Sequence, residues 1–89
     1  YRTYYFNNKI KSLGSIDKNV KMGEWKYYNS KGVLKAKEFW SEDIQDQLEW
    51  EKFYNTKGGI ETELFYKAGL LKKEVYYDEQ GKIYKTNEN

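Results

Sequence analysis

The chain has 89 residues, which is one small domain able to bury only about 60% of its unfolded surface. Sixteen basic and 14 acidic residues are interleaved along it, so the net charge of +2 gives no concentrated field for a polyanion. The chain contains no cysteine and no histidine, which excludes disulfides, thiolate metal sites and imidazole bases. We therefore expect no cofactor, no metal and no nucleic-acid partner.

A short phrase, tyrosine followed by a polar turn and glycine, occurs at residues 28–32, 54–58 and 77–81. A degenerate copy without glycine surrounds Asn7 and Asn8. Self-similarity at a nearly fixed period predicts a repeat architecture, in which each unit is one supersecondary element. We divide this single domain, residues 1–89, into four approximate units: 1–19, 20–45, 46–68 and 69–89.

Each phrase predicts a β-hairpin loop. An Asn or Asp opens the turn through its side chain, and a Gly takes the left-handed position that a β-branched residue disfavours. The six structural turn residues are Asn29, Gly32, Asn55, Gly58, Asp78 and Gly81. Asn7 and Asn8 tolerate the same backbone in the first unit. The expected strands on either side of the three complete phrases are 20–28, 33–40, 48–54, 60–66, 70–77 and 82–85.

Apolar and polar residues alternate along the expected return strands, as half-buried strands require. If successive hairpins pair through these strands, Lys37 lies near Glu63 and Lys35 lies near Glu61, each contributing about 0.2–1 kcal/mol. The ten Tyr, three Trp and four Phe are too many for a disordered chain, so we expect disorder only at residues 86–89.

Residues 41–48 interrupt the pattern. They predict either an extended loop or one to two helical turns capped by Ser41. We favour the loop, because so short a helix is marginal on its own. The resulting fold class is all-β, an open, twisted antiparallel meander of about four hairpins and about eight strands.

Residues 23–40 closely resemble the bacterial variant of the MORN (membrane occupation and recognition nexus) repeat. They carry its leading Gly23, then Trp25, a tyrosine pair, a polar turn with Gly32, and an aromatic end to the return strand. Three other units match more loosely. The resemblance implies a sheet of MORN-like β-hairpin repeats and a non-enzymatic role, often described as antitoxin-like. The membrane role in the family's name is not expected here, and we expect no membrane insertion, because the chain lacks a basic amphipathic face.

Part of the same phrase is similar to cell-wall-binding and choline-binding repeats of bacterial surface proteins, whose stacked aromatic residues bind sugars or choline. Those repeats are shorter and usually carry a further Gly-Trp after the turn, and they are seldom so rich in Lys and Glu. A cell-surface glycan-binding module is therefore the alternative function.

Trp25, Trp40 and Trp50 are candidate binding residues, because tryptophan dominates interface hot spots. The competing interpretation is that they pack the faces of the sheet itself. The solvent exposure of the three side chains distinguishes these two interpretations.

Catalysis has little support. Glu61 and Glu63 project to one side, as a glycosidase pair would, but a solvated polar face explains them. We expect that the protein is not an enzyme.

The one local charge excess is acidic and consists of Glu42, Asp43, Asp46, Glu49 and Glu51; the first three lie in the segment that interrupts the array. Insertions in repeat proteins gather on a binding face, so these residues are candidates for contact with a protein partner; a solvated connection is the alternative. Exposed edge strands also allow self-association. The identity of the partner and the cellular location stay open, since a chain that begins at Tyr1 fits either a mature secreted or cell-envelope protein or a part of a longer one.

Overall fold

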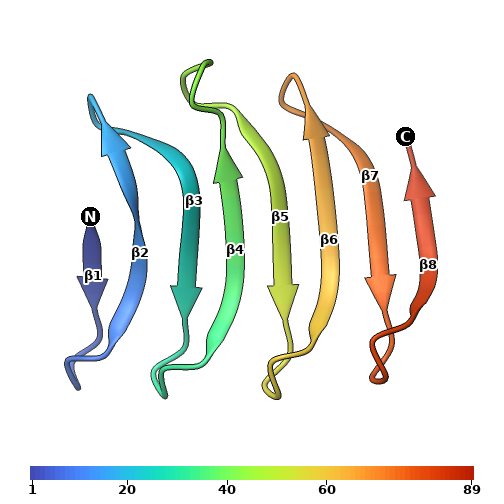
Figure 1. The fold of residues 1–89 in the computed structure, drawn as a ribbon, viewed down its shortest axis with the longest axis horizontal. Coiled ribbons are helices and arrows are strands. Elements are labelled where there is room, and N and C mark those ends of the chain that lie inside the picture. The colour runs from blue at the N-terminus through green and yellow to red at the C-terminus, as the bar shows by residue number, and fades with distance from the viewer.

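The computed structural model describes residues 1–89, and they form one eight-stranded antiparallel sheet (Figure 1). Each strand pairs with its neighbours in sequence, in the order β1 to β8. The strands are β1 (Arg2–Tyr4), β2 (Ile10–Asp17), β3 (Val20–Tyr28), β4 (Leu34–Trp40), β5 (Leu48–Tyr54), β6 (Ile60–Lys67), β7 (Leu70–Tyr77) and β8 (Ile83–Glu88). The predicted all-β antiparallel meander is confirmed. The chain forms no helix of the length and hydrophobicity that a membrane crossing requires.

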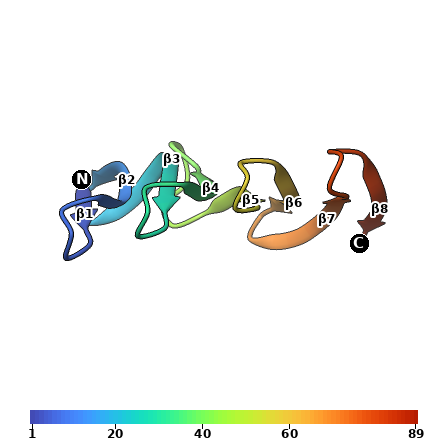
Figure 2. The ribbon, with the colours of Figure 1, turned by 90° about the horizontal axis from the view of Figure 1, so that it is seen from below.

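The sheet is a single layer, as the edge-on view shows (Figure 2). The molecule measures 36 × 33 × 13 Å, and two sheets packed about 10 Å apart, with outer side chains added, would be thicker than that. Only four residues are buried: Trp25, Val75, Ser12 and Ser41. Most of the stability must therefore come from pairs of side chains on adjacent strands rather than from a closed core.

The turns after β3, β5 and β7 share one geometry. In each, the side-chain Oδ1 of the opening residue, Asn29, Asn55 or Asp78, accepts hydrogen bonds from the backbone N–H groups two and four residues later, at 2.9–3.0 Å. The glycine three residues after it has φ between 82° and 89°, the left-handed conformation that the sequence pattern predicts. In the first turn Asn8 takes this conformation instead, with φ 67°.

Two of the three connections at the other end of the sheet are tight turns at Lys18-Asn19 and Ala68-Gly69, whose four residues all have positive φ, between 52° and 79°. Two consecutive left-handed residues are characteristic of the type I′ hairpin, whose twist matches that of the flanking strands. These turns alternate with the Asn/Asp-Gly turns, so that the sheet folds back and forth along its whole width.

The structure corrects two expectations about pairing. Residues 86–88 are ordered within β8, where Thr86 is paired with Val75 of β7, so the predicted disorder of 86–89 was wrong. Lys37 does not lie beside Glu63, because β5 separates β4 from β6. Instead Lys37 lies between Lys26 and Lys52, and Glu63 faces Lys52 with an ion pair of 3.4 Å. The proposed pair of Lys35 with Glu61 fails for the same reason.

Strand alternation and register divide the residues between two faces. We call one side the tryptophan face; it carries Trp25, Tyr27, Glu38, Trp40, Glu51 and Tyr66. We call the other side the lysine face; it carries Lys26, Lys37, Lys52, Phe39, Trp50 and Glu63. The tryptophan face thus pairs Glu38 and Glu51 with tyrosines, and the lysine face combines lysines with the stacked rings of Phe39 and Trp50 and with Glu63.

Candidate functional site

The segment between β4 and β5 is a loop, as the sequence analysis favoured, and we call residues 41–47 the acidic loop. Buried Ser41 organises it. The backbone N–H of Ser41 donates to the carbonyl of Gln47 at 2.8 Å, which closes the loop at its base. Its Oγ accepts from the N–H groups of Asp43 and Ile44 at 3.2 and 2.9 Å. Asp46 takes a positive φ of 58° to complete the turn.

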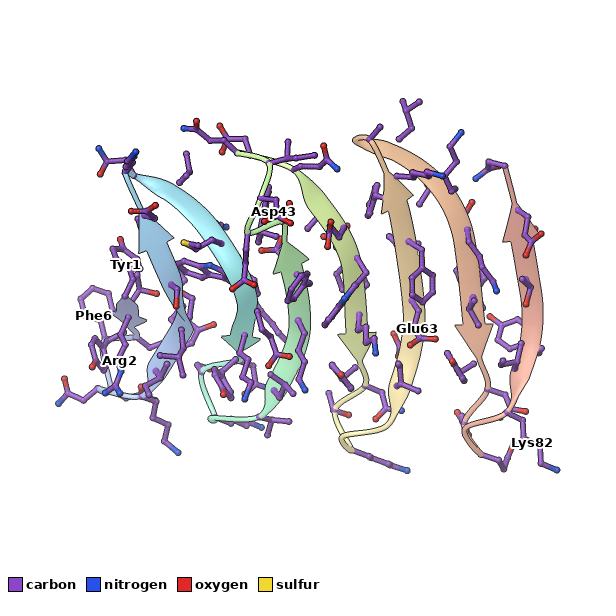
Figure 3. The ribbon with its side chains drawn as sticks, turned by 45° about the horizontal axis from the view of Figure 1, so that its top comes forward. Tyr1, Arg2, Phe6, Asp43, Glu63 and Lys82 are labelled. Atoms are coloured by element: carbon purple, nitrogen blue, oxygen red, sulfur yellow. The ribbon has the colours of Figure 1, made fainter.

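The acidic loop presents charged side chains around one apolar side chain. Glu42, Asp43 and Asp46 are exposed, and the side chain of Ile44 between them is 55% exposed. Asp43 lies where the chain leaves β4 (Figure 3). A depression of about 180 Å³, bordered by Glu42 and Asp43 on one side and by the turn between β2 and β3 on the other, adjoins the loop. The loop and the depression together therefore form a surface that is charged at its edge and concave beside the loop.

Trp25 belongs to the protein's own packing. It is 2% exposed, its Nε1–H donates to the carbonyl of Ser15 at 3.0 Å, and its ring lies 5.8 Å from that of Tyr1. A Cβ added to Gly14 would lie 2.1 Å from the indole, so glycine is what lets the ring lie flat against β2. Trp25 offers no surface to a partner.

Trp40 and Trp50 are half-buried and lie on opposite faces. Trp40, on the tryptophan face, immediately precedes the acidic loop, and its Nε1–H donates to Glu38 at 3.0 Å. Trp50, on the lysine face, stacks on Phe39 with 5.7 Å between ring centroids, and the Nζ of Lys52 lies 4.8 Å above its ring. Of these two tryptophans, Trp40 is thus the one adjacent to the acidic loop in the chain, and Trp50 lies on the other face.

Glu38 is a structural centre that the sequence analysis missed. Its Oε1 accepts hydrogen bonds from the hydroxyl of Tyr27 and the indole N–H of Trp40, and it lies 3.6 Å from the Nζ of Lys21. The same Nζ donates to the Tyr27 hydroxyl at 2.7 Å. A carboxylate on a strand next to tyrosines and tryptophans was the available signal, but only the cross-strand register shows which groups meet.

Similar tyrosine–glutamate pairs recur along the sheet. The hydroxyl of Tyr66 donates to Glu51 at 2.6 Å, and the hydroxyls of Tyr76 and Tyr77 donate to Glu74 and Glu63. Burial, and next the bonded glutamate, raise the pKa of Tyr66 to about 12; the pKa of Tyr27 is raised for the same reasons, with Glu38 as its acceptor. For Tyr76 and Tyr77 the hydrogen bond to glutamate is the first cause of a raised pKa.

These raised pKa values predict a loss of stability at high pH. An unfolded tyrosine titrates near pH 10. The folded chain still holds phenolic protons that the unfolded chain releases above this pH, so the stabilisation is complete below about pH 10 and declines as the pH rises through about 12. The measurement is the urea midpoint between pH 8 and 12. Tyr66→Phe, which has no proton to lose at this position, should flatten the decline; an identical decline in both proteins would contradict the assignment.

The structure also places the two glutamates Glu61 and Glu63, which the sequence analysis considered as a carboxylate pair. Glu63 is engaged by Lys52 and Tyr77, whereas Glu61 on the same strand is exposed and makes no ion pair. No three acidic side chains converge as metal ligands would. No protein-family model matches the chain, and a search of curated proteins gives no match.

Proposed function

We propose that this chain is a non-enzymatic protein-binding module whose contact surface is the acidic loop. The observation that carries the proposal is Ile44, an apolar side chain left 55% exposed among three exposed carboxylates. Because more than half of this side chain is not buried by the protein itself, its apolar surface remains available for burial against a partner. Ser41 fixes the loop backbone through its hydrogen bonds, so the loop loses little conformational entropy when it binds a partner.

The chemistry of this surface defines its partner. An apolar side chain within a charged rim is the common organisation of a protein interface, with the apolar contact supplying affinity and the charges supplying orientation. The partner should therefore present a small apolar pocket bordered by Lys or Arg. The depression beside the loop, bordered by Glu42, Asp43 and Lys21, extends this surface. The resemblance to the variant MORN repeat, with its antitoxin-like role, supports the same class of function.

The test compares two triple charge reversals. One changes the loop residues Glu42, Asp43 and Asp46 to Lys; the matched control changes three exposed glutamates of the lysine face. The control residues are Glu24, Glu61 and Glu88. Both proteins gain the same net charge. After affinity capture of a stoichiometric partner by the unmodified domain, the loop reversal should weaken binding by at least about tenfold, and the control should not.

A second pair of variants separates apolar contact from charge. Ile44→Ala keeps every carboxylate and should still weaken binding, because the anchor is lost, whereas Ile16→Ala, which truncates another exposed isoleucine, should not. A partner that is retained by the loop reversal and lost with the control reversal would move the interface to the lysine face and end this proposal.

A further inference from the structure

The turns that follow β5 and β7 lie at the end of the sheet opposite the acidic loop (Figure 1). A groove of about 930 Å³ lies between them. The ladder between β6 and β7 ends at the pair Thr62 and Tyr76. Beyond this pair the two chains diverge, each toward its own Asn/Asp-Gly turn. The groove is the space between these diverging segments.

The first two turns show that such a space is not an inevitable result of the repeat. There, Tyr5 donates to the carbonyl of Tyr28 at 2.7 Å, Asn7 donates to Ser30 at 2.8 Å, and Lys9 donates to Lys31 at 3.2 Å. These bonds bridge one turn to the next. Residues 55–59 and 78–82 form hydrogen bonds within their own turns, but no hydrogen bond or ion pair joins one of these turns to the other.

The walls of the groove combine free hydrogen-bonding groups with an open aromatic ring. The side chains of Thr56, Glu61, Glu79 and Gln80 make no hydrogen bond or ion pair within the protein, although all line the groove. Tyr84 is 65% exposed, and its ring lies 6.4 Å from that of Tyr76 at an angle of 45°. The tilt leaves the outer surface of the Tyr84 ring uncovered.

We infer that this groove binds a neutral saccharide, with a sugar ring lying against Tyr84 and its hydroxyls bonded to Glu61, Glu79 and Gln80. A carboxylate accepts from neighbouring hydroxyls, and an amide both donates and accepts, which matches the hydroxyl pattern of a sugar. The C–H groups of a sugar ring pack against the negative face of an aromatic ring. This site is separate from the acidic loop and does not depend on the protein partner proposed above.

Other ligand classes fit the groove less well. Lys57 is its one cation, against Glu61, Asp78 and Glu79, which disfavours an anion. A quaternary ammonium requires several ring faces around the charge, but the groove offers only the tilted pair Tyr76 and Tyr84. An apolar ligand requires walls that are predominantly hydrophobic. A polyhydroxylated, uncharged molecule uses the groups that are present.

The test is titration of the ¹⁵N-labelled protein, followed by amide NMR, with neutral trisaccharides of glucose, galactose and N-acetylglucosamine, and with tetramethylammonium as the cationic probe. At least one sugar should shift the amides of residues 56–62 and 78–84 in a saturable way, with millimolar affinity. Tyr84→Ala should weaken that affinity by about three- to tenfold, and Gln80→Ala should weaken it as well. The matched control is Tyr4→Ala, which truncates a tyrosine that is 55% exposed on the opposite edge strand.

Three outcomes would overturn the inference: none of the sugars shifts these amides, tetramethylammonium alone shifts them, or Tyr84→Ala binds as tightly as Tyr4→Ala. Because Tyr84 is exposed, its truncation should preserve the amide spectrum and hence the fold. The triple reversal of the acidic loop should leave sugar binding unchanged. Loss of protein binding and loss of sugar binding are therefore distinguishable.

Discussion

Replacing Trp25 with alanine is expected to lower the free energy of unfolding by about 3–5 kcal/mol. Trp25 is the only large side chain that the single-layer sheet buries almost completely, and it contributes both ring packing and the hydrogen bond to Ser15. A domain of this length has a total stability of roughly 4–13 kcal/mol, so the variant should be largely unfolded or close to it. The measurement is urea denaturation followed by far-ultraviolet circular dichroism.

Two companion variants make this expectation specific. Trp50→Ala removes an indole that is only half-buried, so it should cost less than Trp25→Ala. Gly14→Ala disturbs the same contact from the other side, because its Cβ would overlap the indole, and it should cost about 1–3 kcal/mol. Equal effects of Trp25→Ala and Trp50→Ala would show that stability is spread evenly over the sheet and not centred on Trp25.

The parts of the fold that sequence analysis predicted well are those that depend on local chemistry. Asn55 and Gly58 specify their turn wherever the rest of the chain lies, because the side-chain oxygen and the left-handed glycine act within five residues. Once such turns are placed, the strands that enter them follow: 20–28, 48–54 and 70–77 were predicted with the bounds that the structure has.

The parts that were missed depend on which strands become neighbours. The turns at Lys18-Asn19 and Ala68-Gly69 place Lys18 and Ala68 in a conformation that neither residue prefers, so hairpin pairing and not local preference decides it. Residues 86–88 are likewise ordered by strand pairing, in their case with β7.

Alternation shows which residues share a face, but not which of them is covered. Trp25 is buried because Gly14 lets its ring lie against β2 and Tyr1 packs beside it. For the acidic loop, its existence and charge were predictable, whereas the exposure of Ile44 required the structure.

Replacing Glu38 with alanine is expected to destabilise the protein by about 2–3 kcal/mol. The change leaves the Tyr27 hydroxyl and the Trp40 indole N–H without their acceptor in a half-buried setting, and it removes the counter-charge of Lys21. Hydrogen bonds to a charged acceptor are stronger than those to a neutral one, which is why one carboxylate has so large a role. The measurement is again the urea midpoint.

Glu38→Gln is the matched control, because its amide oxygen still accepts from Tyr27 and Trp40 while the charge is lost. It should recover part of the stability that Glu38→Ala loses, and the remaining difference in stability from the native protein measures the contribution of the charge.

Glu38 also accepts a hydrogen bond from Trp40, the residue that immediately precedes the acidic loop. If that support shapes the binding surface, Glu38→Ala should weaken partner binding more than its loss of stability explains, while Glu74→Ala, which removes a tyrosine–glutamate pair far from the loop, should leave binding intact. Equal binding by both variants would limit Glu38 to a role in stability.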